Sequence, residues 1–145
     1  MKRRTALIGT GLAATTALAG CLDSVPGIAR DTEFEEVDAE LAIEDPPNVT
    51  VDDGTVIVEG TIQYGSSSCG TVELAHTEYG ERERRLDLLI VAETEPSWLP
   101  RGCTDDLVET GYRVEVPASD SLHFVAVTEH HVFGEAYSTT LDVTE

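Results

Sequence analysis

The chain has 145 residues, with 28 Asp and Glu against 9 Lys and Arg, which gives a formal net charge of −19 at pH 7. This length suffices for one small domain with its own hydrophobic core. The acidic balance and the lack of a basic patch exclude a phosphate-binding surface, so we expect no nucleic-acid partner.

The first 20 residues have the pattern of an export signal. Arg3 and Arg4 make the start positive, residues 6–19 form a short apolar run, and small residues lead up to Cys21. The apolar run is shorter than the roughly 20 residues that a membrane-spanning helix needs, so an uncleaved transmembrane helix is the weaker alternative. We therefore expect residues 1–20 to be a signal peptide.

Two motifs of this leader resemble known signals. Residues 18–21, Leu-Ala-Gly-Cys, resemble the lipobox of prokaryotic lipoproteins, in which the cysteine becomes lipidated and N-terminal. Arg3 and Arg4, followed by apolar residues, resemble the twin-arginine export motif, although Ala6 fits one position poorly and the general secretory route stays open. The resemblance implies that a lipid on Cys21 anchors the protein to the extracytoplasmic face of the cell membrane.

The composition that remains after removal of the leader is unusual. It has 28 acidic residues against six arginines and no lysine, a formal net charge of −22 over 125 residues. Such a charge destabilises a compact fold in dilute buffer, whereas in molar salt the Debye length falls to about 3 Å and the repulsion largely disappears. Composition and leader together resemble those of uncharacterised secreted lipoproteins of salt-loving archaea. The resemblance implies a halophilic cell surface and brings no known activity.

Residues 21–47 are expected to form an acidic tether between the lipid and the folded domain. Apolar residues recur at near-helical spacing within residues 32–43, which predicts a short helix there, with an extended spacer as the alternative. Pro46 and Pro47 would end such a helix.

From residue 48 to residue 145 the pattern is that of β-structure. Apolar and polar residues alternate, and a turn at residues 52–54 suits a hairpin. The segment 84–93 has enough consecutive apolar residues for a central strand buried on both faces. We predict an antiparallel β-sandwich of about seven strands, immunoglobulin-like in general architecture. Six of the strands are expected at residues 56–64, 71–79, 84–93, 112–116, 122–129 and 136–143.

One strand carries a further resemblance. Residues 111–116 are similar to the penultimate strand of immunoglobulin-like and fibronectin-type-III-like domains. In those domains a tyrosine near the start of the strand hydrogen-bonds back to the preceding corner, which would be the role of Tyr112 here.

Cys69 and Cys103 remain once Cys21 is assigned to the lipid. Two cysteines in an exported domain most often pair, so we expect a disulfide that clamps the loop at residues 94–106 against the turn at 65–70. Closing a loop of about 35 residues would contribute roughly 3–4 kcal/mol. A metal or redox pair is the alternative, without CxxC spacing or a histidine nearby in sequence to support it.

Histidines form the one cluster with metal-ligand residue types. His130 and His131 are adjacent, and His123 lies on the preceding predicted strand. Imidazole suits copper, zinc or nickel, and Glu129 or Glu135 could supply a further ligand. A small metal-binding surface protein is therefore the second functional hypothesis, with exposed turn histidines as the alternative interpretation.

Two further residues are candidates for surface roles. Trp98, in the long loop, either contacts a protein or glycan partner or folds back over the core. Asn48 begins an Asn-Val-Thr sequon and is a candidate glycosylation site. The arginines at positions 82, 84 and 85 either balance neighbouring acids or mark a patch for an acidic partner.

Patterns of enzymes are weak in this sequence. The carboxylate pairs at residues 52–53 and 105–106 do not follow a calcium-loop pattern, and the serines at 66–68 lack the spacing of a nucleophile elbow. We therefore expect a non-enzymatic binding or structural module without a cofactor, held at the membrane by its lipid and open to a protein or glycan partner.

Overall fold

The computed structural model describes residues 31–94 and 102–144, which form eight strands and no helix. None of these residues therefore belongs to a helix that could cross a membrane. The strands are β1 (Glu33–Val37), β2 (Asn48–Asp52), β3 (Thr55–Gly65), β4 (Gly70–Gly80), β5 (Arg85–Thr94), β6 (Leu107–Pro117), β7 (Phe124–His130) and β8 (Ala136–Asp142).

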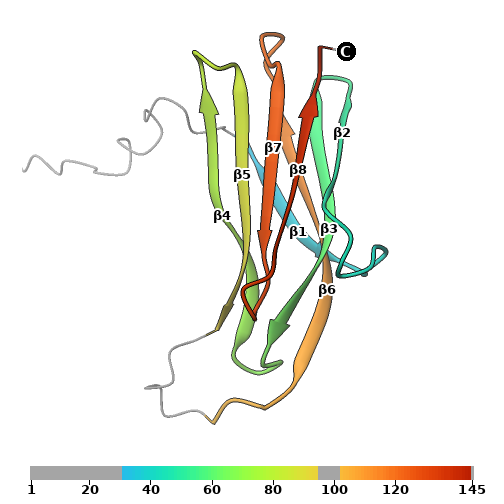
Figure 1. Cartoon of the computed structure of the whole chain (residues 1–145), viewed down its shortest axis with the longest axis vertical. Helices are drawn as coiled ribbons and strands as arrows, with labels where there is room; N and C mark the ends of the chain where they lie inside the picture. The colour runs from blue at the N-terminus through green and yellow to red at the C-terminus, as the bar shows by residue number, and fades with distance from the viewer. Residues whose placement is uncertain (1–30, 95–101, 145) are drawn as a thin grey trace, which may run out of the picture.

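The strands form two sheets of four that pack face to face (Figure 1). The first sheet has the order β1-β6-β3-β2 and the second the order β4-β5-β7-β8. Neighbouring strands are antiparallel except for β5 and β7, which run parallel. The predicted all-β sandwich is thus confirmed, with one parallel pair in its second sheet.

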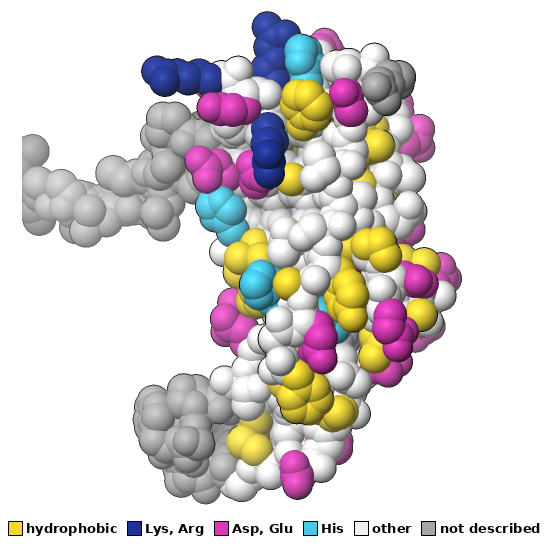
Figure 2. Space-filling model, in the orientation of Figure 1, with side chains coloured by type: hydrophobic (Ala, Val, Ile, Leu, Met, Phe, Trp, Pro, Cys, Tyr) yellow, Lys and Arg dark blue, Asp and Glu magenta, His cyan; other side chains and the backbone are white. Residues whose placement is uncertain are grey.

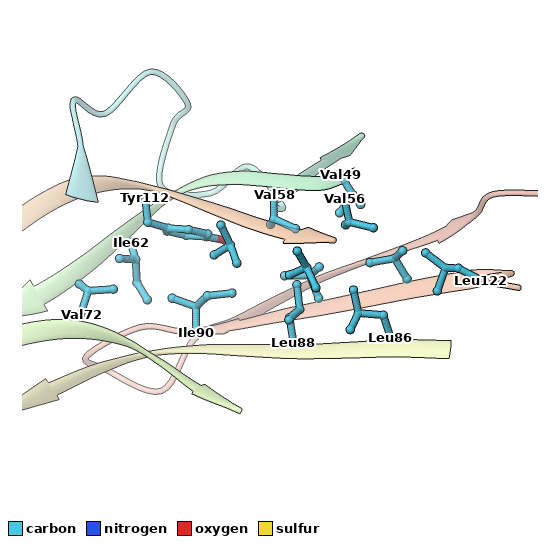
Figure 3. Close-up of a cluster of buried hydrophobic side chains, with 14 residues drawn as sticks. Val49, Val56, Val58, Ile62, Val72, Leu86, Leu88, Ile90, Tyr112 and Leu122 are labelled. Carbon is cyan, nitrogen blue, oxygen red and sulfur yellow. The ribbon is translucent and has the colours of Figure 1, made fainter. Parts of the chain in front are cut away.

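The core lies between the sheets because apolar residues alternate along the strands. Val56, Val58 and Ile62 of β3 point inward and are fully buried. The neighbouring strand β6 adds Tyr112, Val114 and Val116 from the same sheet, and β5 and β7 of the second sheet supply the facing side chains (Figure 3). Burial of each such side chain contributes about 1.5–3 kcal/mol. The prediction that β5 is buried on both faces is wrong, because Leu89 and Val91 on its outer face are only half-buried.

The segment expected to hold a helix forms strand β1 instead. Its residues pair with β6, from Glu33 opposite Glu115 to Val37 opposite Gly111. The Phe34 ring stacks on Tyr112, with the ring centroids 6.3 Å apart. Strand pairing leaves the glutamates in solvent and brings Phe34 to the core, so the sandwich includes residues that the sequence analysis assigned to the tether.

Residues 38–47 cross the outer face of the first sheet, because β1 and β2 lie at its opposite edges. The crossing is close: a Cβ atom at Gly111 would lie 2.5 Å from the carbonyl oxygen of Asp38. The segment ends at Pro47, which is fully buried and whose carbonyl accepts a 2.6 Å hydrogen bond from Thr139 of β8. Asn48 then begins β2.

Candidate functional site

A polar network lies inside the sandwich, between the two sheets. Tyr112 of β6 reaches across the core, and its hydroxyl donates a 2.5 Å hydrogen bond to Glu129 Oε1 of β7. The other carboxylate oxygen, Oε2, lies 3.2 Å from His131 Nε2. Tyr112 and Glu129 are completely buried, and His131 is 6 % exposed.

The hydrogen bonds fix the tautomer of His131. Its Nδ1 accepts a 3.3 Å hydrogen bond from the backbone N–H of Gln63. Nδ1 therefore carries no proton, so Nε2 carries it and donates it to Glu129. The carboxylate thus receives two donors in a site that water does not reach, as a buried acid requires.

Burial controls the ionisation of this network. Desolvation raises the pKa of Glu129 above its usual value, while the hydrogen bonds from Tyr112 and His131 partly oppose that increase. Burial beside Glu129 likewise raises the pKa of Tyr112 well above its ordinary value of 10.0. Tyr112 therefore stays protonated and remains a hydrogen-bond donor at neutral pH.

Gly60 of β3 makes room for these groups. A Cβ atom at this position would lie 2.1 Å from Glu129 Oε1 and 2.5 Å from the Tyr112 hydroxyl. The expectation that Tyr112 bonds back to the preceding corner is wrong, because its partner lies 17 residues later on the opposite sheet. Glu129 was considered only as a metal ligand, although the alternation of buried Val125 and Val127 places residue 129 on the inward face.

The segment after β7 closes one side of the sandwich. β2 pairs with β3 only as far as Glu59, which leaves the edge of β3 free beyond that residue. His131 and Val132 occupy this edge: His131 accepts from the N–H of Gln63, and the N–H of Val132 donates to the carbonyl of Gln63 at 3.1 Å. The buried network and this junction therefore connect the two sheets.

The predicted disulfide between Cys69 and Cys103 is confirmed, with 5.5 Å between the Cα atoms. Hydroxyl groups brace the loop beside it. Thr104 Oγ1 donates to Asp106 Oδ1 at 2.5 Å, and the N–H of Ser67 donates to the same oxygen at 2.9 Å. The side chains of Ser67 and Thr104, followed by the backbone N–H of Ser67, lower the pKa of Asp106 to about 2. The serine run and this carboxylate thus hold the turn together through hydrogen bonds.

The histidines proposed as metal ligands do not come together. His131 is buried with both ring nitrogens engaged, and its neighbour His130 is exposed at the end of β7. His123 lies before the other end of β7, with its Nε2 3.0 Å from Arg84 Nη1. Among residues 31–94 and 102–144, no three His, Cys, Asp or Glu side chains are grouped to hold a metal ion.

Other predicted sites are divided between the described and undescribed parts of the chain. Asn48 is exposed at the start of β2. Cys21, Arg3, Arg4 and Trp98 lie outside the described residues.

One end of the sandwich exposes the apolar side chains of Leu107 and Phe133, with the half-buried Val132 beside them, and we call it the Phe133 end. Phe133 is 67 % exposed and Leu107 is 50 % exposed. Leu107 and Val132 both lie within 4 Å of a Cβ position built at Gly65, so they are neighbours. Figure 2 shows one face of the molecule, on which hydrophobic side chains lie among acidic ones toward the lower end.

The turn that carries Phe133 is held by its own backbone. The N–H of His131 donates to the carbonyl of Glu135 at 2.9 Å, and the N–H of Gly134 donates to the carbonyl of His131 at 3.0 Å. Gly134 has a φ of 90°, which only glycine adopts readily. This turn suits binding, since it presents the apolar side chain of Phe133 on an ordered support.

Comparison with protein families, curated proteins and solved structures finds no match to this chain.

Proposed function

We propose that this protein is a lipid-anchored, extracytoplasmic β-sandwich of a halophilic cell that binds a protein partner through its Phe133 end. The leader with its lipobox cysteine supports the anchoring, and the acidic, lysine-free composition supports the salt-rich surroundings. The proposed role is non-enzymatic, as a binding module of the cell surface.

The observation that carries the binding role is the exposure of Phe133 on an ordered turn. A large aromatic side chain that is 67 % exposed provides apolar area to a partner at little entropic cost when its backbone is already fixed. Exposed carboxylates of Glu135 and Asp105 flank the end in sequence. The partner surface that fits is an apolar pocket with basic groups at its rim.

The direction of the chain supports a binding surface that faces away from the membrane. Glu33, at the start of β1, pairs with Glu115, near the last residue of β6, whereas Leu107 begins β6. The eight residue-to-residue steps from Leu107 to Glu115 correspond to about 26 Å of strand. The start of β1 therefore lies toward the end of the sandwich opposite Leu107 (Figure 1). A tether that joins the domain at this point would place the membrane away from the Phe133 end.

Membrane fractionation of the source cells tests the anchoring. The wild-type chain is expected in the membrane fraction, and a Cys21→Ser variant is expected to leave it, because the lipid supplies the affinity for the bilayer. A wild-type chain in the cytosol with Cys21 unmodified would refute the proposal.

Site-specific photo-crosslinking in intact cells tests the binding surface. A crosslinker in place of Phe133 is expected to form one defined protein adduct, because this side chain is the most exposed large apolar group among the described residues. Phe124, 38 % exposed and at the other end of β7, is the matched control. Adducts of equal yield at both positions, or none at Phe133, would contradict the assignment.

A further inference from the structure

The outer face of the first sheet carries a row of polar residues that spans all four strands. Asn48 of β2 lies opposite Glu59 of β3, Glu59 opposite Arg113 of β6, and Arg113 opposite Glu35 of β1. Arg113 binds Glu59 at 2.5 Å and Glu115 at 2.8 Å. Asn48 therefore stands beside an ordered chain of charged groups.

The crossing segment turns this row into one side of a cleft. Residues 38–41 lie over the sheet and leave an open hollow of about 330 Å³ between themselves and the strands. This volume is at the lower end of the range of small-molecule sites. The lining combines three carboxylates, a guanidinium, an amide and an apolar side chain: Asp38, Glu40, Glu59, Arg113, Asn48 and Leu41.

Asn48 is also the first residue of an Asn-Val-Thr sequon. Both Asn48 and Thr50 are exposed, whereas Val49 between them is buried, with only 8 % of its surface exposed. Because side chains alternate along a strand, the amide and the hydroxyl share the outer face of the sheet. The folded strand thus offers both groups of the sequon on the side where the cleft lies.

We propose that Asn48 carries an N-linked glycan whose first sugar lies in this cleft. The sugar would come from an activated lipid-phosphate donor used by a separate glycosyltransferase of the cell. The bond between the sugar C1 and the phosphate oxygen breaks, the phosphate leaves with the electron pair, Asn48 Nδ2 bonds to C1, and the amide loses one proton. The proposal rests on the proposed function, since the acceptor must be exported.

The chemistry of the lining fits a pyranose ring. Carboxylates of Asp38, Glu40 and Glu59 accept hydrogen bonds from sugar hydroxyls, and the guanidinium of Arg113 donates to them. Leu41 offers an apolar surface to the C–H face of the ring. Contacts of this kind act at hydrogen-bond distance, so they persist in molar salt, where longer-range attraction is screened.

Mass spectrometry of the protein purified from its own cells tests the modification. The peptide that contains Asn48 is expected to carry the mass of added sugars in the wild type and in Thr50→Ser, and to lose it in Thr50→Ala and Asn48→Gln. An unmodified Asn48 in the wild-type protein would overturn the proposal. A Cys21→Ser variant separates the two proposals, because membrane release reports the anchor and the peptide mass reports the glycan.

Hydrogen exchange tests where the sugar lies. Backbone amides of residues 38–41 are expected to exchange about threefold more slowly in the glycosylated wild type than in Asn48→Gln, because a sugar in the cleft restricts the segment that covers it. Amides of the 131–135 turn, at the Phe133 end, serve as the internal control. Equal exchange at residues 38–41 in both forms would show that the glycan points into solvent and would overturn the assignment of the cleft.

Discussion

Replacement of Tyr112 by Phe removes one oxygen atom from the interior and leaves the ring in place. The ring keeps its packing against Phe34, so the change isolates the hydrogen bond to Glu129. The carboxylate then retains only the donor from His131. We expect a loss of stability that reflects a charged acceptor left partly unsatisfied in the core.

The size of the loss follows from the burial of both partners. Glu129 and Tyr112 are fully buried, and hydrogen bonds to charged groups contribute about 1.5–3 kcal/mol. A loss of about 2 kcal/mol lowers the melting temperature of a domain of this size by about 6–12 °C. Tyr79→Phe is the matched control, since the Tyr79 hydroxyl lies 2.9 Å from Ser121 Oγ in an exposed pair. The control should lose less than about 0.5 kcal/mol.

The pH dependence has a definite sign. Burial raises the pKa of Glu129 above 4.5 in the folded state. Well below pH 4.5 the Glu129 carboxyl is neutral in both the folded and the unfolded chain. As the pH rises, this carboxyl ionises first in the unfolded chain. Its contribution to the free energy of unfolding therefore falls until the pH passes the folded pKa. Removal of the Tyr112 donor raises the pKa of Glu129 further. The deficit of Tyr112→Phe should therefore be about 1 kcal/mol near pH 4.5 and larger near pH 7.

Urea unfolding of the wild type, Tyr112→Phe and Tyr79→Phe at constant molar salt measures this effect. The free energies of unfolding are compared at several pH values, so that the general effect of protonating surface acids cancels between variants. A Tyr112→Phe deficit no larger than that of Tyr79→Phe, or a deficit that stays constant with pH, would refute the role assigned to the network.

Three further predictions concern stability. Gly60→Ala should cost about 1–3 kcal/mol, because the new methyl group would overlap Glu129 and Tyr112; Gly102→Ala, with no atom within 4 Å of its Cβ position, is the control in the same urea titration. Cys103→Ser should cost roughly 3–4 kcal/mol, and a reductant should lower the wild-type melting temperature to that of the variant; a wild type insensitive to reductant would contradict this. Raising the salt from about 0.1 to about 1 M should raise the melting temperature, because the Debye length falls from about 10 to about 3 Å; a melting temperature independent of salt would contradict the halophilic interpretation.

The sandwich could be predicted because strand alternation is a local pattern. Val56, Val58 and Ile62 occupy alternate positions of one segment, and each is buried in the structure. Strand β1 was missed because Phe34 and Val37 are spaced like the face of a helix, and a short segment supports either reading. The partner that decides between them is β6, which lies more than 70 residues further along the chain.

The site could be predicted only where a sequence pattern is local or a residue type is rare. The Cys69–Cys103 bond followed from there being two cysteines left to pair. The contact between Tyr112 and Glu129 could not be predicted in this way, because the order of the strands decides which residues face each other across the core. His130 and His131 were treated as a unit, yet adjacent residues at the end of a strand point to opposite faces, so one became a buried partner of Glu129 and the other stayed in solvent.

The last question is why so acidic a chain buries the carboxylate of Glu129 between its two sheets. In a protein covered by repelling acids, apolar packing between the two sheets gives cohesion, but the hydrophobic effect itself has no direction. Glu129 accepts hydrogen bonds from donors placed by β6 and by the turn after β7, and the missing side chain of Gly60 leaves the space that the Glu129 carboxylate and the Tyr112 hydroxyl fill. We therefore expect the directional hydrogen bonds of this network to favour one alignment of the sheets, at the energetic cost of desolvating an acid. That alignment also fixes the residue 131–135 turn to the edge of β3, so the side chain proposed to contact a partner is held by the same hydrogen bonds that join the two sheets.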